Sequence, residues 1–527
     1  MAVFLTFCGT IIAQDTEKSQ GNFINLYGSR QPKHETRAVW LTTLMGLDWP
    51  RAKADDPAGV ERQKRELCEI LDRLQRIHIN TVILQTRIRG TVIYPSRFEP
   101  WDECLTGQPG KAPGYDPLRY CLEECHKRGM ELHAWLVCVP LGKSALQRRY
   151  GSESILRRNP SLCKTAGEDV FMIPGKPETA RYIASLCKEI VENYDVDGIS
   201  LDYIRYPEKV YGFSDDEHYP SPQSVSQPPE KTPAKSRNRR AGRRLSKKPT
   251  IPAAELAAWR RDNITRIVQA VHDSVKPLKP WVKLSSSPIG KYKDLGRYPA
   301  YGWNCYNAVW QDPQAWLRDN LQDLLFPMMY FQGNHFYPFL FDWLENSYGH
   351  PVVPGLGIYF LDPREGKWTL DTVRAEMHTA RASGIGGMAF YRSDFLTRNV
   401  KSLYDACAEE FFPYPALTPP MTWMPTDSAR LPSQPTGLRL DAGNLCWQGD
   451  AYYYNVYGSN QWPVDCSQAA NLLAPHVQGD ACPLSPREQS LRYFAVTASD
   501  RFGNESTPAT LRNDKYRKRQ MPKSSSK

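Results

Sequence analysis

The segment VDGISLDYIRYP, residues 196–207, places an acidic side chain where an apolar run ends. The run is typical of a buried strand, and Asp202 follows it directly, with Tyr203 and Arg205 close behind. An unpaired charge in such a place costs several kcal/mol. The pattern therefore favours either a functional carboxylate held ionised by Tyr203 and Arg205, or a structural ion pair between Asp202 and Arg205.

Aromatic and basic side chains follow other apolar runs of the chain in the same way. Together with the neighbours of Asp202, we expect these side chains to line a groove and contact a substrate. The predicted contact residues are Arg87, Trp135, Tyr203, Arg205, Trp310, Tyr330 and Tyr359. Aromatic side chains present large flat faces that suit stacking on sugar rings. With two carboxylates they suit glycoside hydrolysis, in which one carboxyl group protonates the leaving oxygen and the other attacks the sugar or activates water.

The second carboxylate of such a pair is predicted to be Asp312, which lies beside Trp310 in the sequence WQDP. The alternative is that Asp312 is the N-cap of a helix over 313–320, a common role for an Asp before Pro. Neither interpretation is favoured by the sequence. The rival candidates are Asp48, Asp102 and Asp394.

Other kinds of chemistry find little support in this sequence. It contains no G-x-S-x-G motif, which argues against serine-based acyl transfer. The acidic, His and Cys residues show no metal-ligand spacing, and no Gly-rich phosphate loop follows an apolar run. We therefore expect neither a metal nor another cofactor.

The elements that position these residues alternate between short apolar strands and amphipathic helices. We predict strands at 37–43, 81–87, 131–139, 197–203, 282–287, 324–330, 352–359 and 385–391. We predict helices at 60–77, 117–128, 177–193, 254–275, 337–347, 370–383 and 400–411. Eight strands in this alternation predict a (β/α)8 barrel over 34–412, with its active site at the C-terminal ends of the strands. An open doubly wound sheet is the alternative, disfavoured by the count of eight and the missing phosphate loop.

The last part of the chain has a different pattern. A Pro-rich linker over 413–430 precedes short alternating strands separated by turns, which predict an all-β, immunoglobulin-like sandwich over 431–512. The stretch YFAVTASDRFGNES, residues 493–506, resembles the last hairpin of a fibronectin type III domain. We assign this domain no chemistry.

The net charge of +10 comes from two basic runs. Residues 229–250 contain nine Lys/Arg and one Glu, and residues 511–527 contain seven Lys/Arg and one Asp. The two runs together carry more positive charge than the whole chain, so the rest of the chain is mildly acidic. We expect a disordered insert over 221–250 and a basic tail over 513–527. Because these runs lack interleaved aromatics, they do not favour a specific nucleic acid, but they are compatible with an anionic cell-envelope surface. The sequence does not indicate an oligomeric state.

Residues 2–13 are apolar and end in Ala13-Gln14, so residues 1–14 are similar to the remnant of a secretory signal. We therefore expect an exported protein. Thirteen Cys are scattered along the chain, and disulfides are conceivable among the last three, Cys446, Cys466 and Cys482.

DGISLDYIRYP resembles the chitinase signature of family 18 glycosidases, in which a Glu two residues after the last Asp is the acid. Here Ile204 stands at that place, which disfavours the chitinase mechanism. A longer resemblance, to the glycosyl hydrolase-like 10 family, runs along the barrel. It rests on ETRAVWLTT, LDWP, YPSRFEPWDECLTGQPGKAPGYDPL, HKRGMELHAWL, DGISLDYIRYP, WRRDNITRIV, SSSPIG, WQDPQAWL and FPMMYF.

This resemblance implies a secreted (β/α)8 glycosidase with Asp202 as the leading catalytic candidate. A characterised branch of the family in Gram-negative bacteria cleaves peptidoglycan glycan strands stripped of their peptides, which implies a polysaccharide substrate and a periplasmic or cell-envelope location. The chain departs from the family pattern R-x-x-G-D after the second strand, where it reads RIRGT with Thr91. A catalytically degenerate barrel that only binds glycans is the alternative function.

Overall fold

The computed structural model describes residues 31–220, 251–298, 300–424 and 431–513. Several expectations fall outside these ranges. They concern the signal segment 1–14, the basic insert 221–250, residues 425–430 of the linker and residues 514–527 of the tail.

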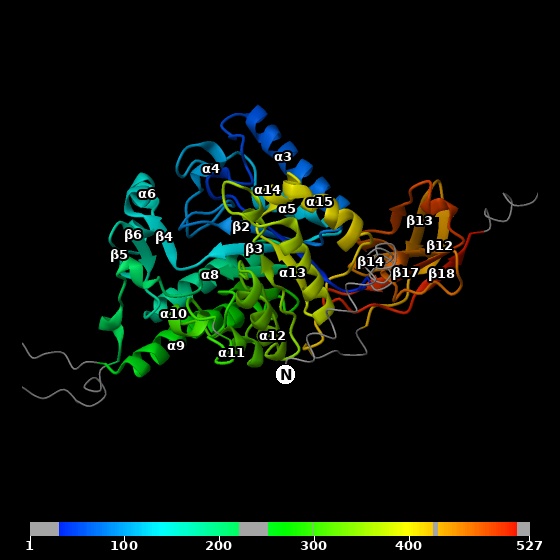
Figure 1. The fold of residues 1–527 in the computed structure, drawn as a ribbon. Helices are drawn as coiled ribbons and strands as arrows, with labels where there is room; N and C mark the ends of the chain where they lie inside the picture. The colour runs from blue at the N-terminus through cyan, green and yellow to red at the C-terminus, as the bar shows by residue number, and fades with distance from the viewer. Residues whose placement is uncertain (1–30, 221–250, 299, 425–430, 514–527) are drawn as a thin grey trace, which may run out of the picture.

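Eight parallel strands form the central sheet of the molecule (Figure 1). They are β1 (Thr36–Leu41), β2 (Thr81–Arg87), β3 (Glu131–Val137), β7 (Gly198–Asp202), β8 (Lys283–Ser287), β9 (Leu324–Leu325), β10 (Gly355–Leu356) and β11 (Gly387–Phe390). The ladder runs β10-β11-β1-β2-β3-β7-β8-β9, and bridges from Leu325 to Val352 and from Met328 to Gly355 join its two ends. The sheet therefore closes on itself, which confirms the predicted barrel.

Strands β9 and β10 are much shorter than the sequence predicts. Pro327 follows β9 closely, and Pro351 and Pro354 precede β10. Proline cannot donate a hydrogen bond to a ladder, so continuous pairing is interrupted there. Backbone bonds such as Val353 N to Leu325 O, at 2.8 Å, still hold the two segments together.

Helices cover the outside of the barrel. The longer ones are α3 (Pro57–Arg76), α5 (Pro117–His126), α8 (Pro177–Asn193), α9 (Ala253–Val275), α12 (Tyr337–Glu345) and α13 (Leu370–Ser383). Other helices are short, and α6 among them lies beside the small sheet of β4, β5 and β6 (Figure 1). They are α4 (Glu103–Thr106), α6 (Ser144–Arg149), α7 (Ile155–Arg158), α10 (Cys305–Ala308), α11 (Pro313–Arg318), α14 (Ser393–Thr397) and α15 (Leu403–Ala406). The last predicted helix, 400–411, begins three residues late because Lys401 and Ser402 adopt left-handed backbone angles, and it ends as a π-helix over Cys407–Phe411.

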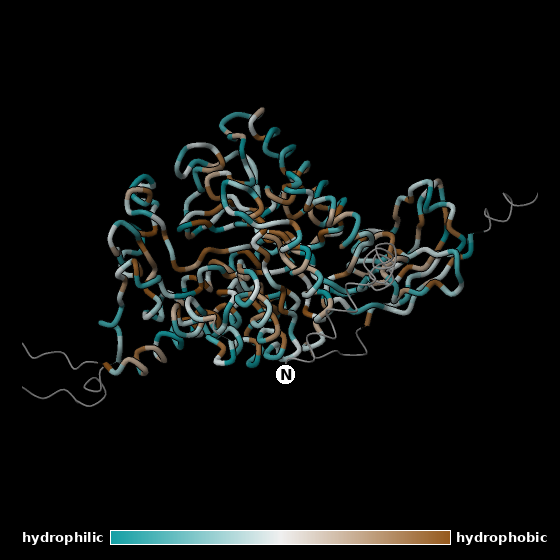
Figure 2. Tube along the Cα trace, in the orientation of Figure 1, coloured by the Kyte–Doolittle hydropathy of each residue, from teal (hydrophilic) through white to brown (hydrophobic). Residues whose placement is uncertain are grey.

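Strand periodicity sorts side chains between two cores. Alternate residues point to opposite faces, so Val39 and Leu41 of β1 pack outward against helices, whereas Ala38 and Trp40 point into the barrel. Figure 2 shows the apolar stretches concentrated on the central strands. The inner core contains Ala38, Trp40, Ile83, Trp135, Val137, Leu324, Phe326, Val353 and Ala389.

The C-terminal region is all β. One antiparallel sheet orders β12 (Thr436–Asp441), β13 (Asn444–Gln448) and β16 (Ala481–Pro483). The other orders β15 (Leu472–Val477), β14 (Tyr453–Ser459), β17 (Tyr493–Ser499) and β18 (Ala509–Arg512). Side chains from both sheets, including Trp447 and Val496, share one core, as in a sandwich.

This β domain packs against the barrel at the end where the strands begin. Asp195 lies three residues before β7 begins at Gly198. Its carboxylate accepts a hydrogen bond from Arg501 at 2.6 Å and another from the Tyr452 hydroxyl. The C-terminal ends of the strands are therefore left to the opposite side. The twelve described cysteines are all free thiols, including Cys446, Cys466 and Cys482. Among the described helices, none combines the length and apolarity needed to cross a membrane.

Candidate active site

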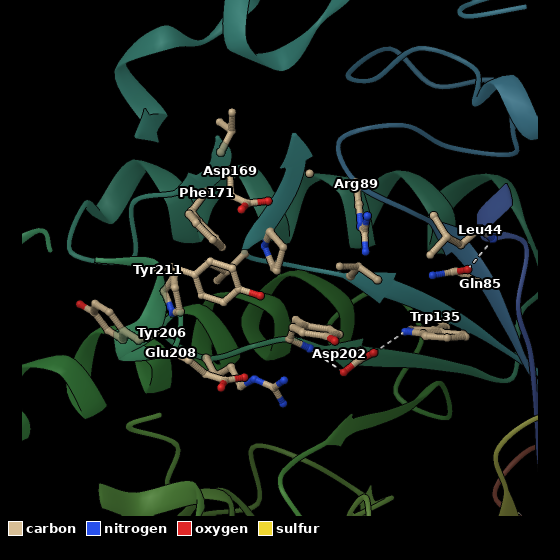
Figure 3. A pocket seen from close by; sticks show the side chains of 18 of the residues that line it. Leu44, Gln85, Arg89, Trp135, Asp169, Phe171, Asp202, Tyr206, Glu208 and Tyr211 are labelled. Atoms are coloured by element: carbon tan, nitrogen blue, oxygen red, sulfur yellow. Dashed lines mark hydrogen bonds between the residues drawn. The ribbon is translucent and has the colours of Figure 1, made fainter. Parts of the chain in front are cut away.

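A cavity of about 550 Å³ opens at the C-terminal ends of the barrel strands (Figure 3). Its polar and aromatic lining includes Gln85, Arg89, Trp135, Lys143, Asp169, Phe171, Asp202, Tyr203, Arg205, Tyr206, Glu208, Tyr211, Tyr330 and Tyr391. In Figure 3, Arg89 reaches in from the side opposite Asp202 and Trp135. The cavity occupies the place where barrel enzymes carry their active sites.

Asp202 ends β7 with its side chain inside the barrel. Gly198 and Ser200 share this face by the two-residue period, whereas Ile199 and Leu201 pack outward. The Trp135 indole N–H donates to Asp202 Oδ2 at 3.1 Å, and the Tyr203 backbone N–H donates to Oδ1 at 2.7 Å. The carboxylate is therefore held in one orientation at the cavity wall.

Burial raises the pKa of Asp202 to about 6, although the charge of Arg205 and the N–H donors of Tyr203 and Trp135 act in the opposite direction. The carboxyl group is almost fully excluded from solvent, so desolvation of its charged form dominates. A carboxyl group with such a pKa holds its proton at mildly acidic pH. That property suits a general acid.

Arg205 lies on aromatic rings and does not pair with Asp202. Its Cζ atom is 4.3 Å from the ring centroid of Tyr203 and 5.2 Å from that of Trp303. Within the described chain, no ion pair joins Arg205 to Asp202, and the Arg205 Nη1 atom is buried without a hydrogen-bond partner. The structure therefore disagrees with the interpretation of these two residues as a structural ion pair.

Tyr203 holds a left-handed backbone conformation, with φ of 49°. Bulky residues rarely adopt this conformation, and such strain gathers at functional sites. The ring is 40% exposed, one of the more exposed large side chains on this face. Tyr203 thus joins Trp135, Arg205 and Tyr330 as predicted contact residues that the structure places in the lining; their binding of substrate stays a prediction.

One wall of the cavity is a small antiparallel sheet inserted after β3. It consists of β4 (Pro140–Lys143), β6 (Asp169–Met172) and β5 (Cys163–Ala166), and stands away from the barrel in Figure 1. It brings Asp169 and Phe171 to the lining, and the Phe171 ring meets that of Tyr211 at 5.3 Å. Sequence reasoning missed this wall, although the alternation in DVFM was a weak signal for a strand.

Arg87 does not face the groove, contrary to the prediction. Two residues of β2, Thr86 and Arg87, oppose Leu136 of β3 where the register shifts, and such an irregularity re-aims the following side chain. Arg87 is buried and forms a bidentate pair with Glu99, at 2.6 and 2.7 Å. Arg89, two residues further on, lines the cavity instead.

Trp310 and Asp312 are not brought to the cavity lining. Trp310 is 8% exposed and packs its ring edge-on against Tyr206 at 5.4 Å, so it belongs to the core. Asp312 precedes α11 but makes no side-chain cap, and its Oδ1 accepts from the Tyr292 hydroxyl at 2.7 Å. The prediction that Trp310 lines the groove is therefore wrong, and Asp312 lies in a neighbouring polar contact.

The remaining predicted residues have supporting places. The Tyr359 ring is 5.7 Å from Tyr330 and 5.8 Å from Tyr391, so it packs behind the lining. The rival carboxylates are engaged elsewhere: Asp48 pairs with Arg392, Asp102 caps α4, and Asp394 pairs with Arg51 and Arg398.

Thr91 is buried, and its hydroxyl donates to Asp102 Oδ2 at 2.6 Å. It does not belong to the cavity lining. The departure from the family pattern therefore lies beside Asp102, outside the described lining of the cavity that contains Asp202.

Two lining carboxylates accompany Asp202. Asp169 pairs with Lys143 at 3.0 Å, whereas Glu208 is half-buried and, as far as the structure describes the chain, has no ion pair. The described residues contain no group of three or more His, Cys, Asp or Glu side chains that could hold a metal ion. The described lining offers carboxyl groups, basic side chains and aromatic rings.

The family model of glycosyl hydrolase-like 10 matches residues 35–354, which include every strand that frames this cavity up to β9. The chain belongs to the glycosyl hydrolase-like 10 family. Glycosyl hydrolase YngK of Bacillus subtilis (strain 168) is 27% identical over 510 residues, covering 90% of this chain and 92% of its own. Glycosyl hydrolase DigH of Escherichia coli (strain K12) is 30% identical over 320 residues, covering 57% of this chain and 67% of its own.

Among solved structures, the chain is similar to the glycoside hydrolase domain of PgaB (BpsB) from Bordetella bronchiseptica. The TM-score is 0.46 at 14% identity, over 72% of this chain and 99% of that one. Membership of the family supports a glycosidase and a glycan substrate, as expected from the residues of the cavity. The names of the two relatives specify neither the sugar nor the linkage.

Proposed function

We propose that this protein is an exported glycoside hydrolase that cleaves the glycan strands of bacterial peptidoglycan after their peptides have been removed. The observation that carries the proposal is Asp202, a buried carboxyl group with a raised pKa on the wall of an aromatic cavity. The family, whose Gram-negative branch acts on such strands, supports the choice of glycan. Its place of action would then be the periplasm or the cell envelope.

Asp202 acts as the general acid. Its proton passes to the oxygen of the departing sugar while the bond from that oxygen to the anomeric carbon breaks. The Trp135 and Tyr203 N–H groups donate to the carboxylate that forms, and the nearby charge of Arg205 stabilises it. These interactions favour the ionised product of the proton transfer and so lower the barrier to it.

Glu208 is the second carboxylate, which attacks the anomeric carbon or takes a proton from the attacking water. It follows Asp202 by six residues, lines the same cavity and is not engaged in an ion pair among the described residues. Asp169 is less suited because Lys143 already neutralises it. This assignment replaces Asp312 as the partner of Asp202.

The test is release of reducing ends from purified peptidoglycan, with and without prior amidase treatment, by the unmodified protein and by Asp202→Asn. The proposal expects new reducing ends chiefly from amidase-treated strands, and none above background with Asp202→Asn. If the unmodified protein binds the strands but releases no reducing ends under any condition, the chain is a glycan-binding barrel, and the hydrolase proposal is abandoned.

A further inference from the structure

The guanidinium of Arg205 is a buried cation without a counter-ion. Its side chain is 5% exposed, and its buried Nη1 atom has no hydrogen-bond partner. No ion pair of the described residues involves Arg205, although its charge acts on nearby Asp202 and lowers the pKa of that carboxyl group. A buried charge without a partner is costly, which is why most buried arginines in this chain, such as Arg37 and Arg87, are paired with carboxylates.

Arg205 belongs to the lining of the cavity, and its guanidinium lies against aromatic rings. Tyr203 and Trp303 contact the guanidinium at 4.3 and 5.2 Å, and an arginine stacked on rings keeps its N–H donors free at the edge of its plane. Arg205 lines the same cavity as Asp202, which it follows by three residues in the chain. A ligand that reaches Asp202 therefore passes within reach of a fork of donors suited to an anion.

Arg205 is unlike the other cations of this cavity. Lys143 is neutralised by Asp169 at 3.0 Å. Arg89 is only partly buried, so water solvates its charge. Of the cations in the described lining, Arg205 alone combines deep burial with an unpartnered donor. Planar donor forks bind carboxylates in a bidentate manner.

We propose that Arg205 binds a carboxylate substituent of the glycan, next to the bond that Asp202 protonates, and so selects acidic sugars with a free carboxyl group. This inference rests on the proposed function and specifies its substrate. In a peptide-free peptidoglycan strand, the lactyl ether of the muramic acid unit ends in a free carboxylate. In an intact strand the same group is an amide, which carries no charge and continues into a peptide.

The selection follows from electrostatics. The free carboxylate removes the cost of burying an unpaired guanidinium, whereas an amide does not compensate the charge. Arg205 would thereby make the protein discriminate stripped strands from peptide-bearing ones.

The experiment compares two substrates that differ only in this group. The first is the set of peptide-free strands obtained by amidase treatment. The second is the same material after carbodiimide coupling of its lactyl carboxyl groups to methylamine. The second-order rate constant of cleavage, kcat/KM, is measured for the unmodified protein, Arg205→Gln and Arg205→Lys. Arg261→Gln is the matched control, because Arg261 stacks on Tyr306 at 3.9 Å outside the cavity lining.

We expect the unmodified protein to prefer the free strands by about 10- to 100-fold, the range that one charge-assisted hydrogen bond supplies. Arg205→Gln should lose that factor on free strands in addition to the loss that both substrates share, because its charge also stabilises ionised Asp202. Arg205→Lys should keep part of the preference, and Arg261→Gln all of it. Equal rates on both substrates, or a preference that survives in Arg205→Gln, would overturn the inference while the hydrolase proposal stands.

A binding measurement separates the inference from the hydrolase proposal. In an Asp202→Asn background, calorimetry should show tighter binding of free strands than of amidated strands, and Arg205→Gln should abolish the difference. This result supports the inference even if no cleavage is ever observed. Equal binding of both materials, or no binding of either, overturns it. Thermal melting identifies a misfolded variant, in which case Arg205→Lys provides the decisive comparison.

Discussion

The two ends of the barrel contrast in how they treat buried charge. At the ends where the strands begin, Glu131 accepts from Lys283 at 2.6 Å and from the Thr418 hydroxyl at 2.6 Å, and it lies 3.2 Å from His133. Asp197, before β7, accepts from His126 at 2.8 Å. At the ends where the same strands finish, Asp202 has a raised pKa and Arg205 lacks a counter-ion.

The contrast separates stability from chemistry. Burial opposes ionisation of Glu131, but Lys283 and His133 lower its pKa below the usual range, so it stays charged and paired. At Asp202 the balance is reversed, and burial raises the pKa. The C-terminal β domain covers the first end, where the charges are satisfied, and leaves the second end to a ligand.

The largest expected effect is that of Asp202→Asn on turnover. The change keeps the shape of the side chain and removes its proton, so kcat should fall by about 10³-fold or more while strand binding survives. Reducing-end assays and calorimetry on one preparation measure both quantities. Activity retained within tenfold, together with a lowered melting temperature, would show that Asp202 is structural and would remove the contrast.

At the other end, Glu131→Gln should act on stability alone. It leaves Lys283 buried without a partner, so the free energy of unfolding should fall by about 3–5 kcal/mol, with kcat unchanged. Denaturant unfolding and turnover report the two effects separately. The double change Glu131→Gln with Lys283→Met should recover part of the loss, since it removes both charges. A loss of kcat in a folded Glu131→Gln protein would contradict this division.

The pH dependence should carry the signature of Asp202. Because a general acid must be protonated, kcat/KM should fall about tenfold per unit as the pH rises above about 6. The raised pKa also means that protonated Asp202 favours folding: this contribution is complete below its ordinary pKa near 4 and is lost as the pH rises through about 6. Melting temperatures of the unmodified protein and Asp202→Asn across pH 3–8 should therefore converge or cross over that interval.

A smaller effect is expected from Trp135→Phe. The indole N–H lowers the pKa of Asp202, so its loss should raise that pKa and shift the fall of kcat/KM to higher pH. The change should also reduce kcat by about fivefold. The pH–rate profile measures the displacement. An unchanged limb with a lowered kcat would mean that Trp135 only shapes the cavity.

The smallest effect is expected from Asp312→Asn, because Asp312 accepts from Tyr292 outside the cavity lining. Its kcat should stay within about threefold of the unmodified value. The matched change Glu208→Gln should reduce kcat by 100-fold or more, since it removes the second carboxylate of the cavity. If the two variants exchange these results, Asp312 regains the role that the sequence suggested.

The chain's pattern alone determined the barrel and the place of Asp202. Eight apolar runs in alternation with amphipathic helices predict a closed parallel sheet, because each strand must bury both faces. The two-residue period of β7 puts Gly198, Ser200 and Asp202 on one face, and the same period points Trp135 of β3 inward. These are local properties of consecutive residues, so they can be read without the tertiary structure.

The rest of the site depended on tertiary structure. A register shift between β2 and β3 directs the Arg87 side chain toward Glu99. A sheet inserted between β3 and α8 brings Asp169 and Phe171 to the cavity. Trp310 was drawn into the core by contact with Tyr206. Side chains in loops are aimed by partners far away in the sequence, because loop backbones lack the fixed periodicity of strands. The sequence therefore named the carboxylate on the strand, and only the fold decided which cations and rings surround it.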